Sequence, residues 1–226
     1  MPGTSVLDDI ELIIEDIGGG HGGQPPARDD GGNEGDSGNG RPERGRRGAR
    51  KIAAAVGLLM VSILVLFLTL AAAFVFLRIH PLRPWTSLRL PGILWLNTLV
   101  LVASSATLEV ARRKLYWGEP RAFNRWWALT TLLGAAFVAG QVAAWGELTA
   151  GGVNWGSQMA GWFFYVFTAL HAAHILGGLL ALLYVQFRRF DAASPARAAA
   201  ADVASYYWHF MDGLWVFLFA LLYLGR

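Results

Sequence analysis

Five long apolar runs dominate the pattern of hydrophobic and polar positions along the chain. They cover about residues 52 to 79, 92 to 114, 126 to 147, 157 to 187 and 203 to 225. Each run is long enough to cross a hydrocarbon core, which needs roughly 20 helical residues. The pattern therefore predicts an all-α, polytopic membrane protein. We expect a bundle of five transmembrane helices over residues 51 to 226, preceded by a disordered N-terminal tail.

The first fifty residues have a different character. Residues 18 to 50 are rich in Gly, Pro and charge, and such a segment buries too little apolar surface to offset the entropy of ordering, so we interpret it as a flexible tether. Residues 5 to 17 carry an apolar stripe at helical spacing, which predicts a short acidic amphipathic helix. The stripe consists of Val6, Ile10, Ile13 or Ile14, and Ile17. Because so short a helix does not hold alone in water, the segment is either a frayed tail or docked on a partner.

Lys and Arg are unevenly distributed between the two sides of the predicted bundle. From residue 41 onward, fourteen lie before the first run, between the second and third, or between the fourth and fifth, and four lie in the other segments. Basic segments tend to remain in the cytoplasm. We therefore expect a cytoplasmic N-terminus and a C-terminus on the opposite side of the membrane.

Composition excludes several kinds of chemistry. The chain has no cysteine, so it cannot form disulfides, iron–sulfur clusters or thiolate copper and zinc sites. It also has no phosphate-binding glycine loop, no nucleophile elbow and no basic patch interleaved with aromatics, so neither these enzyme classes nor nucleic acid binding is indicated.

Histidines in the fourth and fifth runs are the candidate metal ligands. His171 and His174 are three residues apart and share one helix face, so they can present two imidazoles to a metal. With His209 they make a candidate three-histidine set. The alternative is structural, with imidazoles hydrogen-bonding between helices that approach closely at small residues.

Two acids within the apolar runs have neighbours that suggest a role. Asp212 follows His209 by three residues, so its carboxylate can accept from the imidazole in either a structural pair or a proton relay. Glu109 lies within one turn of Arg112 and Arg113, which indicates an ion pair near the cytoplasmic surface or a contact with lipid headgroups or a subunit.

Motifs in three of the runs resemble one family, cytochrome c oxidase subunit III. The last run follows the family pattern W-H-F-x-D-x-x-W-x-x-x-F through Trp208, His209, Phe210, Asp212, Trp215 and Phe219. The fourth run resembles the family helix through Gly161, Phe164, Thr168, His171, His174 and Gly178, with Ala169 in place of a usual Gly. The second run resembles L-N-T-x-x-L-x-x-S-S-x-T-x-x-x-A through Asn97, Thr98, Ser104, Ser105, Thr107 and Ala111.

The resemblance implies a non-redox subunit of a bacterial haem-copper terminal oxidase, in the five-helix form, in the plasma membrane with the C-terminus periplasmic or extracellular. Haem and copper then belong to partner subunits, and this chain holds no catalytic residue, cofactor or metal. The implied partners are subunit I directly, subunit II, other respiratory complexes in the same assembly, and phospholipid. Subunit III of this family supports proton uptake and stability during turnover. The alternatives are an accessory subunit of nitric oxide reductase and a free-standing proton-coupled carrier.

Under this resemblance the polar residues of the runs become lipid-cleft or helix-packing residues. They are Asn97, Ser104, Ser105, Thr107, Glu109, His171, His174, Trp208, His209 and Asp212. One departure from the family stands in the first run, where relatives commonly carry an acid directly after a Ser. Alignment on Phe74 to Arg78 places that Ser at Ser62 and the acid at Ile63, so the carboxylate is missing.

Overall fold

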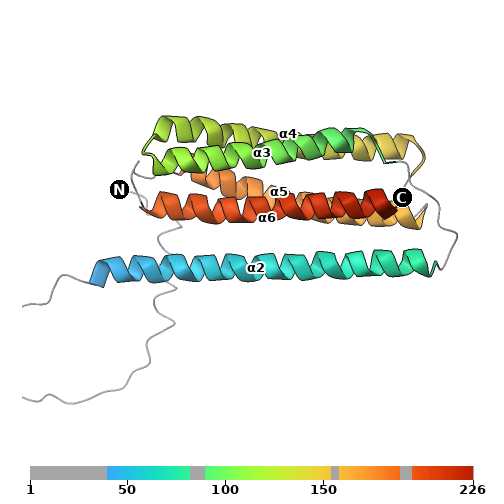
Figure 1. Cartoon of the computed structure of the whole chain (residues 1–226), viewed down its shortest axis with the longest axis horizontal. Coiled ribbons are helices and arrows are strands. Elements are labelled where there is room, and N and C mark those ends of the chain that lie inside the picture. Colours follow the sequence, from blue (N-terminus) through green and yellow to red (C-terminus); the bar gives the residue numbers. More distant parts are fainter. Residues whose placement is uncertain (1–39, 82–89, 154–157, 189–194, 226) are drawn as a thin grey trace, which may run out of the picture. The chain divides into compact units, whose positions relative to one another are not determined.

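The computed structural model of the protein describes residues 40–81, 90–153, 158–188 and 195–225. This part of the chain is all-helical, which confirms the predicted fold class. Figure 1 shows its helices running alongside one another. They are α2 (Gly40–Ile79), α3 (Ile93–Tyr116), α4 (Pro120–Ala150), α5 (Met159–Phe187) and α6 (Pro195–Gly225). All five contain a stretch long and apolar enough to cross a membrane.

Three helices begin earlier than the apolar runs suggested. The helices α4 and α6 begin at Pro120 and Pro195, rather than near residues 126 and 203. Proline is favoured in the first turn of a helix because its missing N–H has no intrahelical partner there. The helix α2 begins at Gly40, inside the segment interpreted as a tether, and extending an existing helix avoids the cost of nucleating a new one. The predicted helix at residues 5 to 17 lies outside the described residues.

Four of the helices form a closed ring of neighbours. Helix α3 contacts α4, α4 contacts α5, α5 contacts α6, and α6 contacts α3. The fifth helix, α2, is attached by long side chains on one face. Phe67 contacts His171 and His174 of α5, and Phe74 contacts two α5 phenylalanines. At its end, Arg78 Nη1 donates to the Leu224 carbonyl of α6 over 2.6 Å.

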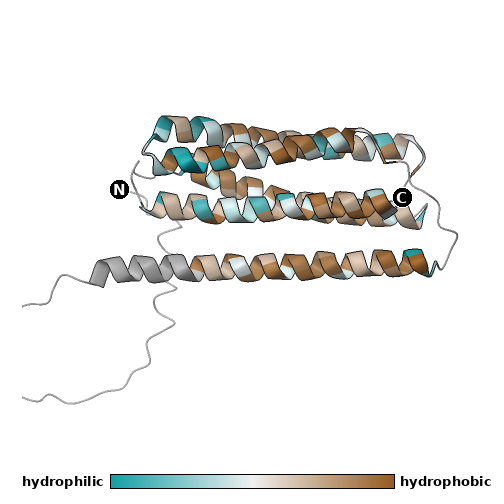
Figure 2. Ribbon diagram, in the orientation of Figure 1, coloured by the Kyte–Doolittle hydropathy of each residue, from teal (hydrophilic) through white to brown (hydrophobic). Residues whose placement is uncertain are grey.

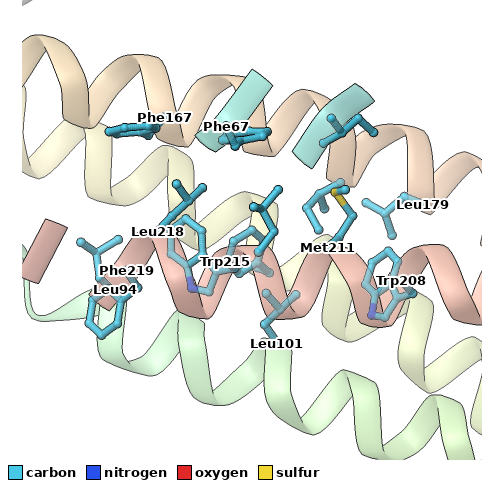
Figure 3. Close-up of a cluster of buried hydrophobic side chains, with 14 of the residues drawn as sticks. Phe67, Leu94, Leu101, Phe167, Leu179, Trp208, Met211, Trp215, Leu218 and Phe219 are labelled. Atoms are coloured by element: carbon cyan, nitrogen blue, oxygen red, sulfur yellow. The ribbon is translucent and has the colours of Figure 1, made fainter. Parts of the chain in front are cut away.

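Aromatic side chains fill the interior of this helix bundle. Those with less than 2% of their surface exposed are Phe67, Trp127, Phe123, Phe137, Phe164, Phe167, Trp208 and Trp215. Figure 3 shows Trp208 and Trp215 on one helix, with Leu179 next to Trp208 and Phe67 reaching in from α2. Many exposed side chains are also apolar, and Figure 2 shows hydrophobic colours along most of the coloured part of α2. A bundle that is apolar on both faces is expected where lipid replaces water.

Candidate functional site

Polar side chains concentrate where α3 meets α6, and we call this contact the α3–α6 seam. Two indole N–H groups of α6 donate across it, Trp208 Nε1 to Ser104 Oγ at 2.9 Å and Trp215 Nε1 to Thr98 Oγ1 at 3.1 Å. Ser104 and Trp208 are fully buried. A buried indole needs such an acceptor, since an unsatisfied N–H within hydrocarbon is costly.

One hydroxyl joins the histidine and the acid of α6. Ser105 Oγ lies 2.8 Å from His209 Nδ1 and donates to Asp212 Oδ2. The i, i+3 spacing suggested a direct contact between imidazole and carboxylate, but the structure places the hydroxyl of α3 between them. The imidazole meets this hydroxyl through Nδ1, so the other ring nitrogen, Nε2, takes no part in the contact.

The second oxygen of this carboxyl group is isolated. Asp212 is 6% exposed, and its Oδ1 has no hydrogen-bond partner in the part of the chain that the structure describes. A buried polar atom of this kind is rare in folded proteins and marks a place where water or another group completes the site.

A cluster of charged groups closes the end of the seam at Tyr116. Glu109 pairs with Arg113 at 3.0 Å and with Arg112 at 3.7 Å, as the sequence spacing predicted. Arg112 also reaches Asp202 of α6 at 3.5 Å, and Tyr116 donates to the same carboxylate at 2.5 Å. These contacts fix the ends of α3 and α6 to each other through opposite charges.

The two histidines of α5 have different surroundings. His171 is fully buried among rings of three other helices, with centroid distances of 6.5 Å to Phe67, 5.9 Å to Phe137 and 5.1 Å to Trp215. Neither of its ring nitrogens has a hydrogen-bond partner among the described residues. His174 Nδ1 instead lies 2.7 Å from the Leu170 carbonyl of its own helix. Within the described ranges, no three His, Cys, Asp or Glu side chains are grouped to hold a metal, so the three-histidine set is not brought together.

The remaining residues singled out in the sequence lie between α3 and α4. Thr107 and Thr130 hydroxyls are 2.8 Å apart. Asn97 packs so tightly on Gly140 that a Cβ atom there would clash with its amide. Next to it Gln141 is 1% exposed, with neither amide atom bonded to any described residue. These contacts belong to helix packing.

One buried contact was missed in the sequence. Arg197 is 8% exposed, donates through Nη2 to Asn124 Oδ1 at 2.5 Å and stacks over Phe123 at 4.6 Å. It lies between the fourth and fifth apolar runs, so the pattern of the sequence predicts a loop there. Reading Pro195 as the first residue of a helix would have placed Arg197 in the first turn of α6.

Comparison with known proteins covers the helical part of the chain. A family model described as cytochrome c oxidase subunit III matches residues 49–225. A probable cytochrome c oxidase subunit 3 of Nocardia farcinica is 41% identical over 130 residues, which are 57% of this chain and 64% of that protein. The subunit 3 of Corynebacterium diphtheriae is 39% identical over 127 residues, 56% of this chain and 62% of its own. The subunit 3 of Synechocystis is 29% identical over 177 residues, which are 75% of this chain and 73% of that protein.

Proposed function

We propose that this chain, which belongs to the cytochrome c oxidase subunit III family, acts as the non-redox subunit III of a bacterial haem-copper terminal oxidase. The chain is a multi-pass membrane protein. The observation that carries the proposal is that the motif residues hydrogen-bond to one another between helices. Ser104, Ser105 and Thr98 on one helix accept or share hydrogen bonds with Trp208, His209 and Trp215 on another.

This use of the motifs supports a scaffolding role. Interhelical hydrogen bonds of this kind stabilise membrane bundles by about 1 kcal/mol each, and the aromatic rings around His171 leave it inside the packed core. We infer that haem and copper belong to subunit I and subunit II of the same assembly. Phospholipid is expected along the exposed apolar faces, such as that of α2.

The arrangement in the membrane follows from charge. The ends of α3 and α4 that carry Arg112, Arg113, Lys114, Arg121 and Arg125 lie on the side that we infer to be cytoplasmic, by the excess of basic residues there. The C-terminus of α6 then faces the periplasm or the exterior. Addition of a reporter enzyme after residue 226 tests this, since activity confined to the cytoplasm would reverse the orientation.

Purification of the complex through a tag on this chain tests the function. We expect a large subunit with haem, and copper detected by metal analysis together with the haem absorption spectrum. A haem-containing partner without copper would favour the alternative, an accessory subunit of nitric oxide reductase. Recovery of this chain alone, from membranes that retain an intact oxidase, would favour a free-standing carrier and contradict the proposal.

A further inference from the structure

Two stripes of side chains lie side by side on the outward side of the α3–α6 seam. Each stripe follows the i, i+4, i+7 spacing of one helix face. They are Val102, Ala106 and Glu109 on α3, and His209, Gly213 and Val216 on α6. The contact of Ser105 with His209 brings the two stripes together. We call these six residues the α3–α6 flank. All six are exposed or half-exposed.

The imidazole of the flank lies at the depth of the membrane interior. Ser105 is at the middle of α3 (Ile93–Tyr116), so its neighbour His209 is near the middle of the bilayer. His209 is half-exposed, and no described group bonds to its Nε2 atom. Lipid tails carry no hydrogen-bonding group for this ring nitrogen, and polar side chains left in hydrocarbon are costly.

The outward face of α2 is different and fits lipid well. Its exposed side chains are apolar, including Leu58, Val61, Val65 and Leu68. Its two hydroxyls are satisfied by their own helix, with Ser62 donating to the Leu58 carbonyl at 3.0 Å and Thr69 to the Val65 carbonyl at 2.8 Å. This face needs no partner, whereas the α3–α6 flank does.

We propose that a membrane-spanning helix of a partner subunit covers the α3–α6 flank and hydrogen-bonds to His209 Nε2 through a hydroxyl or amide side chain. Ala106 and Gly213 leave room for that helix to approach closely, as small residues do at membrane helix contacts. The inference rests on the proposed oxidase assembly and adds the face by which the chain joins it.

Bulky substitution of the exposed glycine tests the contact in the intact complex. Gly213 is exposed and a Cβ atom added there has no neighbour within 4 Å, so Gly213→Leu directs its side chain from an open position of the chain. The matched control is Gly146→Leu on α4, where the added Cβ is equally free. We expect Gly213→Leu to weaken retention of this chain by the haem-containing subunit about tenfold, as an overpacked contact does. The control is expected to retain it fully.

Photochemical cross-linking identifies what covers the flank. A photoreactive amino acid is placed at Val102, which is 51% exposed, and separately at Val65 of α2, which is 57% exposed. Both valines lie near the middle of their helices. After irradiation of the purified complex, we expect Val102 to give an adduct with a membrane segment of the large subunit and Val65 to give lipid adducts.

Each other outcome contradicts the inference. Lipid adducts from Val102, or an adduct with a second copy of this chain, would refute it even where the complex contains haem and copper. Equal retention of both leucine variants would do the same. Failure of the proposed function is seen separately, because the chain then purifies without any haem-containing subunit.

Discussion

Trp208 provides the sharpest test of how the bundle is packed, because it fills the space between three other helices. Its indole N–H donates to Ser104 of α3. Its ring lies against two glycines. A Cβ atom added at Gly134 of α4 would be 2.5 Å from Trp208 Cη2 and 2.9 Å from Leu179 Cδ2, and one added at Gly178 of α5 would be 3.1 Å from Tyr207 and 3.2 Å from Trp208. Figure 3 shows how closely Leu179 approaches this ring.

Gly134→Ala should therefore destabilise the chain by overpacking. Overpacking in a closely packed core costs about 1–3 kcal/mol, while replacing a helical Gly by Ala contributes about 0.5–1 kcal/mol of stability. Gly146→Ala is the control for the second effect, because its added Cβ meets nothing within 4 Å. The difference in unfolding free energy between the two variants should be about 1–3 kcal/mol.

Unfolding of the purified chain in mixed detergent micelles, followed by helical circular dichroism, measures this difference. Trp208→Phe removes the indole atoms that come closest to an alanine at position 134 and leaves its contact with Leu179 Cδ2. The double variant Gly134→Ala with Trp208→Phe should thus be more stable than the sum of the single effects, by a coupling of about 0.5–3 kcal/mol. Equal stability of Gly134→Ala and Gly146→Ala, or strict additivity in the double variant, would refute the packing described above.

Three further predictions follow from individual contacts. Ser104→Ala removes the acceptor of the buried Trp208 N–H and should cost about 1–2 kcal/mol in the same assay, whereas Ser62→Ala, whose hydroxyl is exposed and bonded within its own helix, should change little. Metal analysis of the chain separated from its partners should find no stoichiometric iron, copper or zinc. A stoichiometric metal ion that disappears when His171 and His174 are replaced would contradict this prediction. Carbodiimide should leave residues 52 to 79 unlabelled, because they contain no Asp or Glu, and should label Ile63→Glu; absence of that label would refute the alignment of this helix with the family.

The apolar runs predicted the helices well because membrane spans need long, nearly uninterrupted apolar segments. The starts of α4 and α6 were predicted about two turns too late. Pro120 and Pro195 lie outside the apolar runs, but each begins a helix. The late start predicted for α6 also leaves out one interhelical contact, because Arg197 of α6 donates a hydrogen bond to Asn124 of α4.

The partners of the polar residues could be predicted only where they lie on the same helix. Glu109 finds Arg113 because a spacing of four residues places the two side chains on one face. The role of Ser105 depends on how α3 and α6 meet, and no spacing within either helix contains that information. His209 and Asp212 therefore seemed to form a direct pair, although both reach the same hydroxyl of α3.

The isoleucine at position 63 and the hydrogen bond of His174 within its own helix are both consistent with the way α2 packs on α5. Ile63 is 3% exposed and lies one turn before Phe67, whose ring contacts His174 at 5.8 Å. A carboxylate at position 63 would be buried one turn from the place where Phe67 contacts the His174 ring, and a buried unpaired charge is costly. In this chain isoleucine removes that charge, and His174 satisfies its Nδ1 atom at the Leu170 carbonyl. The contact between α2 and α5 is therefore apolar and aromatic here.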